Sequence, residues 1–136
     1  MTDEKGLKLG LLALRIGIAV VFLAWTLDKI FNPQHNTGMI NHYYFVRISH
    51  TVILIVGIAE LFLLGAFLLG IKKNITYLLI LLFHLVTTIA SFKRLLPPYE
   101  IHQLLYFGSI PMLGACICLY LARNYDTLFT LGGSKA

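Results

Sequence analysis

Four long apolar stretches alternate with short polar connections along this chain. They cover residues 7–31, 51–70, 75–92 and 102–122. Each has about the length that an α-helix needs to cross roughly 30 Å of hydrocarbon at about 1.5 Å per residue. Lipid offers the backbone no hydrogen-bond partners, so each stretch is expected to be helical. The pattern predicts an all-α integral membrane protein, a four-helix bundle with antiparallel up-down topology.

The connections between these spans differ in length and character. Residues 32–50 form the longest, and Asn32-Pro33 is a credible stop for the first helix. Residues 39–48 are aromatic enough to lie along the membrane interface as a short helix. The other connections are expected to be a tight turn at 70–74, a segment at 93–100 broken by Pro97 and Pro98, and a flexible tail after Arg123 that ends in Gly-Gly-Ser-Lys.

Composition supports a membrane protein and narrows its partners. Of the 136 residues, 58% are hydrophobic and only 12% are charged, against about 25% charged in ordinary soluble domains. A single transmembrane domain over residues 1–136, with the lipid bilayer as its first partner, follows. The net charge of +5 is spread over the short polar segments, so no basic surface for nucleic acid is predicted.

The distribution of basic residues predicts an orientation. Four spans place both termini on one side, with six basic residues there and four on the other: Lys5, Lys8, Lys72, Lys73, Arg123 and Lys135 against Lys29, Arg47, Lys93 and Arg94. By the positive-inside rule the termini face the cytoplasm. We therefore expect a multi-pass protein of the cell (inner) membrane.

Three of the apolar spans each contain one ionisable residue near the middle. Arg15, Glu60 and His84 lie eight to ten residues from the expected inner ends of their helices, at a depth of about 12 to 15 Å. A charge at that depth costs at least about 2.5–3.5 kcal/mol on insertion scales, so it normally has a partner. We expect an Arg15–Glu60 ion pair with His84 hydrogen-bonded to one member.

Other polar residues extend this cluster. Tyr77, His84 and Ser91 recur every seven residues along the third span, with Thr87 and Thr88 between them, and Lys29 lies near the outer end of the first. The predicted ligand-binding set is Arg15, Glu60, His84, Tyr77, Thr87, Thr88 and Lys29. The alternative is a structural lock between helices. Catalytic residues stay unassigned, because no nucleophile with an adjacent base is evident.

Histidine and cysteine give no further chemistry. The spacings of His35, His42, His50 and His102 match no standard zinc or haem motif, and no metal site is predicted. Cys116 and Cys118 are turned about 200° from each other on a helix, so they are read as packing residues.

The first two spans resemble the DoxX family of small four-helix membrane proteins. The first shares an early arginine, a glycine, a phenylalanine-containing run and a late lysine, here Arg15, Gly17, Phe22 and Lys29. The second resembles the family's glycine-flanked acidic segment, here Gly57, Glu60, Gly65 and Gly70. The resemblance implies a membrane partner of redox enzymes. The long first loop, with its histidines and tyrosines, departs from the family pattern.

Two functions follow from these observations. The first is a redox-associated membrane subunit with a polar intramembrane site for a quinone or another small apolar ligand. The second is a non-enzymatic membrane scaffold, or an assembly or chaperone protein, in which the same residues form a structural ion pair. A partner membrane or redox protein and a homo-oligomer are both compatible with the sequence, and whether the protein is an enzyme stays open. A small transporter is weaker, because four short helices leave little room.

Overall fold

The computed structural model describes residues 2–96 and 103–131, and every regular element in these ranges is helical. The elements are α1 (Asp3–Phe31), α2 (Pro33–Tyr44), α3 (His50–Leu68), α4 (Lys73–Ala90), two short 3₁₀ helices, η1 (Phe92–Leu95) and η2 (Gln103–Gly108), and α5 (Ser109–Leu121). Four helical segments are long and apolar enough to cross a membrane: Asp3–Phe31, His50–Leu68, Lys73–Ala90 and Leu104–Leu121. The prediction of an all-α, multi-pass membrane protein is confirmed.

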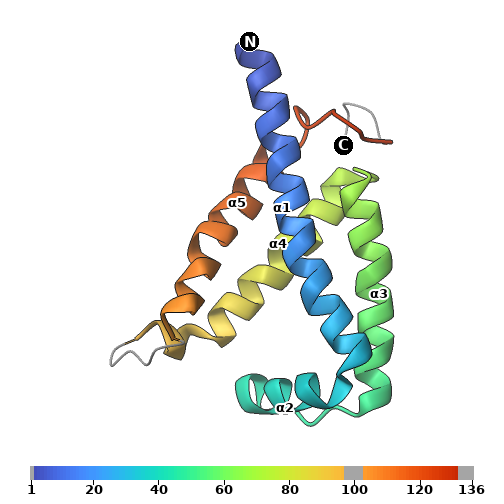
Figure 1. Cartoon of the computed structure of the whole chain (residues 1–136), viewed down its shortest axis with the longest axis vertical. Coiled ribbons are helices and arrows are strands. Elements are labelled where there is room, and N and C mark those ends of the chain that lie inside the picture. Colours follow the sequence, from blue (N-terminus) through green and yellow to red (C-terminus); the bar gives the residue numbers. More distant parts are fainter. Residues whose placement is uncertain (1, 97–102, 132–136) are drawn as a thin grey trace.

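The spans run alternately up and down (Figure 1). The N-terminus, the turn between α3 and α4, and the segment after α5 lie at one end of the molecule, and α2 lies across the other. Helix α1 packs along α3 and also contacts α5, while α4 packs against α5 and contacts α3 near their shared turn. The first turns of α1 project beyond the α3–α4 turn.

The core lies where the four spans meet. It is built from one face of α1, including Leu11, Ile18 and Phe22, a spacing that keeps side chains on one side of a helix. Phe67 of α3 and Tyr77 of α4 belong to the same core, and the centroids of their two rings lie 5.0 Å apart. Large apolar side chains remain on the outer faces of the helices, as expected for surfaces that lipid covers.

The first connection folds differently from the prediction. Helix α1 ends at Phe31 as expected, but the next helix covers Pro33–Tyr44 rather than 39–48. Proline fits the first turn of a helix, where its missing N–H needs no partner. The carboxylate of Asp28 then accepts hydrogen bonds from Asn36 and Asn32, which fix α2 to the end of α1.

Several expectations fall on segments that the structure does not describe. They concern the break at Pro97 and Pro98, the start of the last span at His102, and the flexibility of the Gly-Gly-Ser-Lys stretch. All of them lie outside the described residues.

Candidate functional site

Arg15 is held in a buried cluster at the end of the molecule that carries the α3–α4 turn. Its Nη1 donates to Asp126 Oδ2 at 3.0 Å and to the Tyr77 hydroxyl at 3.4 Å, and its Nη2 donates to the Leu128 carbonyl. The Tyr77 hydroxyl in turn donates to the same Asp126 oxygen. Arg15 is 1% exposed and Asp126 0%. Hydrogen bonds of this kind offset the cost of taking a buried ion pair out of water. They do not use every atom of the pair, because Arg15 Nε and Asp126 Oδ1 are buried without a hydrogen-bond partner among the described residues.

The segment after α5 supplies Asp126 and folds back over the α3–α4 turn. The buried Lys73 ammonium donates to the carbonyls of Arg123 and Asp126. Further along, the Leu131 N–H donates to the Leu69 carbonyl at 2.8 Å. Residues 123–131, here named the C-terminal clasp, are therefore tied to α1, α3 and α4 at once.

Gly70 makes room for the clasp. Its φ of +67° is a left-handed conformation that favours glycine, and a Cβ there would lie 2.6 Å from Thr130 Cγ2. We expect Gly70→Ala to lower the free energy of unfolding by at least about 1–2 kcal/mol, because alanine is strained in the left-handed conformation. The new Cβ would also lie 2.8 Å from Thr130 Cβ, which cannot move without its backbone. Thermal unfolding in detergent, followed by circular dichroism, measures the loss. Gly65→Ala is the matched control, since a Cβ there meets nothing within 4 Å. Equal unfolding midpoints for the two variants would contradict the expectation.

Glu60 belongs to a second cluster, between α1 and α3. Its Oε2 accepts from Lys29 Nζ at 2.7 Å and from the Thr26 hydroxyl at 3.3 Å. Gly57, one turn earlier on α3, lets α1 approach, since a Cβ there would lie 3.0 Å from Ile30 Cγ1. This close approach lets the short Glu60 side chain reach Lys29.

His84 belongs to a third cluster, where α4 meets α1 and the start of α5. Its Nε2 lies 2.9 Å from the Ser109 carbonyl oxygen. A carbonyl only accepts, so Nε2 carries the proton and Nδ1 presents a lone pair in the neutral ring. The ring stacks on Trp25 at a centroid distance of 6.0 Å and meets Phe22 edge-on at 6.4 Å. His84 Nδ1 and Ser109 Oγ are both buried and have no hydrogen-bond partner within residues 2–96 and 103–131.

The predicted meeting of Arg15, Glu60 and His84 is wrong. Arg15 pairs with Asp126, and Glu60 pairs with Lys29. The prediction aligned residue 7 with the α3–α4 turn, but the first turns of α1 project beyond that turn (Figure 1). Arg15 reaches the turn instead, because its Nη1 lies 3.5 Å from the position of a Cβ at Gly70. Thr26, which contacts Glu60, is eleven residues further along α1, or about 16 Å.

The other predicted residues divide among these clusters. Tyr77 joins Arg15, and Lys29 joins Glu60. The Thr88 hydroxyl donates to the His84 carbonyl and lies 3.5 Å from its Nε2. Thr87 is exposed, and its hydroxyl donates to the carbonyl of Phe83 on its own helix. Lys29 therefore belongs to the Glu60 cluster, and the single polar cluster predicted from the sequence does not form.

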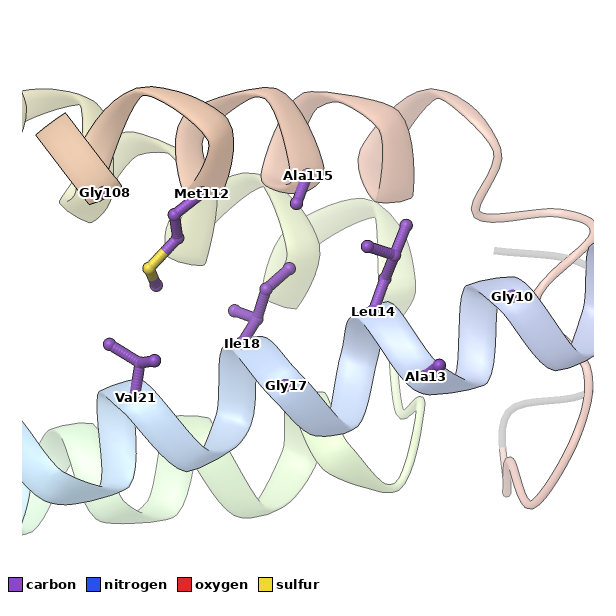
Figure 2. Close-up of a pocket in the computed structure, with 9 residues that line it drawn as sticks. All are labelled: Gly10, Ala13, Leu14, Gly17, Ile18, Val21, Gly108, Met112 and Ala115. Atoms are coloured by element: carbon purple, nitrogen blue, oxygen red, sulfur yellow. The ribbon is translucent and has the colours of Figure 1, made fainter.

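An apolar groove of about 400 Å³ runs between α1 and α5. Small residues widen it, including Gly10, Ala13 and Gly17 on α1 and Gly108 at the start of α5. Figure 2 shows Val21 and Ile18 pointing from α1 toward α5, and Met112 pointing back from α5. The groove leads to Gly108, the residue before Ser109.

Sequence reasoning missed Asp126 and Ser109. Asp126 is the only acidic residue after Glu100. It follows the last span on the side of the membrane where the first span, which carries Arg15, begins. A single acid in that position is the signal that could have identified it as the partner of Arg15. No comparable signal marks Ser109, because one serine in an apolar helix is common. No group of three His, Cys, Asp or Glu residues that could hold a metal occurs in the part of the chain that the structure describes.

Comparison with known proteins identifies a family for this chain. The family model described as methylamine utilisation protein MauE matches residues 7–97, which is more than half of the chain. The matched segment holds Arg15, Glu60 and His84 and ends before Ser109 and Asp126. No curated protein and no solved structure matches the chain.

Proposed function

This chain belongs to the family of the methylamine utilisation protein MauE, and from that premise we propose that it is a redox-associated membrane subunit with a site for a small apolar ligand of the quinone class. Using methylamine requires oxidation of a reduced carbon, so electrons must reach an acceptor. A small membrane subunit of such a system can pass these electrons to an acceptor that dissolves in the membrane. The match supports a membrane protein family of this general kind, and the likeness to DoxX in particular gains no support from it.

Four buried side-chain atoms have no hydrogen-bond partner among the described residues: Arg15 Nε, Asp126 Oδ1, His84 Nδ1 and Ser109 Oγ. The first two belong to an ion pair that is bonded through its other atoms, so the proposed ligand site rests on His84 and Ser109. A buried polar atom without a hydrogen bond costs about 1–3 kcal/mol, so such atoms call for an explanation. Here two of them belong to residues that already touch through the His84 Nε2 contact to the Ser109 carbonyl. A ligand that bonds to both atoms would remove that cost.

The seven predicted ligand-binding residues do not share this role equally. We assign His84 to contacting the ligand, and Thr88, whose hydroxyl lies 3.5 Å from His84 Nε2, to supporting its ring. We assign Arg15 and Tyr77 to holding the C-terminal clasp, and Lys29 and Glu60 to joining α1 and α3. Thr87 bonds within its own helix.

A second candidate function, a non-enzymatic scaffold or assembly protein, is favoured by those same ion pairs. Asp126 and Glu60 each have a cation partner within the chain. Such pairs can fix helix register without any ligand. Under this reading the protein holds a partner membrane or redox protein, or a second copy of itself, and binds no quinone.

The proposed location is the cell (inner) membrane with both termini in the cytoplasm. The bias of basic residues toward the terminal side supports this orientation. Lys72, exposed at the α3–α4 turn, lies on that side together with the N-terminus (Figure 1).

Deleting the gene in its native host tests the functional assignment. We expect methylamine-driven oxygen uptake by the deletion strain to fall to background, because electrons from the amine no longer reach the membrane. Succinate-driven uptake should stay unchanged, and the wild-type gene supplied in trans should restore the loss. Unchanged methylamine-driven uptake in the deletion strain, or none in the wild-type host, contradicts the proposal.

A further inference from the structure

The groove between α1 and α5 has the dimensions of a site for one apolar tail. From Gly10 to Val21 it follows eleven residues of α1, or about 16 Å. A Cβ built at Gly10, Gly17 or Gly108 would meet nothing within 4 Å. The glycines thus leave real open space, rather than contact with a neighbouring helix.

Two residues with unpartnered polar atoms are connected to Gly108 at one end of this groove, although neither is among the residues that line it. Ser109 follows Gly108, which lines the groove, and His84 is held to the Ser109 carbonyl. His84 is 1% exposed, and its Nδ1 has no hydrogen-bond partner in the described part of the chain. The Ser109 hydroxyl can donate a hydrogen bond and His84 Nδ1 can accept one. The residue that follows Gly108 therefore carries one unused donor, and the residue bonded to its carbonyl carries one unused acceptor.

We infer that this groove binds the tail of a prenylated quinone or quinol, with the ring directed past Gly108 to His84 and Ser109. This inference rests on the proposed function and names the site where the ligand binds. Ser109 would donate to a ring carbonyl, and His84 Nδ1 would accept from a ring hydroxyl in the reduced form. The flat ring would lie beside the aromatic faces of Phe22 and Trp25, which already flank His84.

The surroundings favour a neutral head over a charged one. Arg15 is paired with Asp126, and Lys29 with Glu60. None of the residues that line the groove is charged. A fatty acid or a phospholipid would bring a charge with no counter-ion beside Ser109 and His84, which is costly at low dielectric. A quinone has no such charge.

Trp25, the only tryptophan of the chain, provides the test because its ring stacks on His84. The full chain in lipid nanodiscs is titrated with decylubiquinone, and Trp25 fluorescence is followed. We expect saturable quenching in the wild type. Gly17→Leu, which fills the groove, should raise the half-saturating concentration at least about tenfold. Gly65→Leu is the matched control, also open at its Cβ but outside the groove, and should behave as the wild type.

Ser109→Ala separates ligand binding from a structural role. Ser109 Oγ has no partner, so its removal should leave the unfolding midpoint of the ligand-free protein unchanged or slightly higher. It should nevertheless weaken decylubiquinone binding severalfold. A residue with only a structural role would not show this combination.

Three results would overturn the inference. The first is quenching that does not saturate, or that is equal in Gly17→Leu and Gly65→Leu. The second is competition by decanol as effective as that by decylubiquinone, which would make the groove a site for any lipid tail. The third is unchanged binding by Ser109→Ala. Because the measurement uses purified protein, a negative result leaves the methylamine assay in cells as an independent test of the proposed function.

Discussion

Replacing Asp126 with Ala should lower the free energy of unfolding by about 3–5 kcal/mol, the usual cost of breaking a buried ion pair by removing one partner. Arg15 is 1% exposed and would keep its charge without a carboxylate nearby. The Tyr77 hydroxyl would lose its acceptor at the same time. The unfolding midpoint in dodecylmaltoside, followed by circular dichroism, measures the effect.

A double variant tests whether the loss comes from the unpaired charge. Arg15→Met combined with Asp126→Leu removes both charges and keeps similar volumes, so it should recover most of the stability lost by Asp126→Ala. Glu4→Ala, which removes an exposed carboxylate paired with Lys8, is the control and should leave the midpoint unchanged. A double variant as unstable as Asp126→Ala would show that the clasp depends on backbone contacts instead.

The clasp explains why this end of the molecule needs a buried charge. The described residues after α5 contribute few apolar side chains to the core. Backbone carbonyls of the clasp would remain without donors unless side chains reached them. Arg15 and Lys73 supply those donors to Leu128, Arg123 and Asp126. The buried cations therefore satisfy a returning backbone as well as a carboxylate.

The spans and their direction could be predicted from the sequence because both depend on local composition. An apolar run of membrane length must be helical in lipid, and four such runs alternate in direction. The end of α1 was also predictable, since Asn32-Pro33 stops a helix locally. Helix α2 was placed too late because its start depends on Asp28, a residue of the preceding helix.

The partners of the polar residues could not be predicted because sequence gives their depth only relative to assumed helix ends. The prediction was wrong by a few helical turns about where α1 begins relative to the α3–α4 turn. It therefore paired Arg15 with Glu60, whereas Arg15 pairs with Asp126 and Glu60 with Lys29. Depth also says nothing about direction around the helix axis. Thr26 faces Glu60, while its neighbour Trp25 faces His84, because consecutive side chains diverge by about 100°.

Lys29→Met should destabilise the protein more than Glu60→Gln does. Glu60 lies in the middle of α3, and without Lys29 its carboxylate keeps only the Thr26 hydroxyl. An unpaired charge at the centre of a span costs about 2.5–3.5 kcal/mol. Lys29 lies two residues from the end of α1, so its long side chain can turn toward water when Glu60 is neutral.

The order of the two variants in stability tests this expectation. Unfolding midpoints in dodecylmaltoside should fall in the sequence wild type, Glu60→Gln, Lys29→Met. The double variant Lys29→Met with Glu60→Met should have an unfolding midpoint close to that of the wild type. The two side chains are 16–19% exposed, and their main effect on stability is that each neutralises the charge of the other. Equal losses for the two single variants would mean that Lys29 is held in place by the close packing of α1 on α3 at Gly57 and cannot reach water, so that either unpaired charge stays at depth.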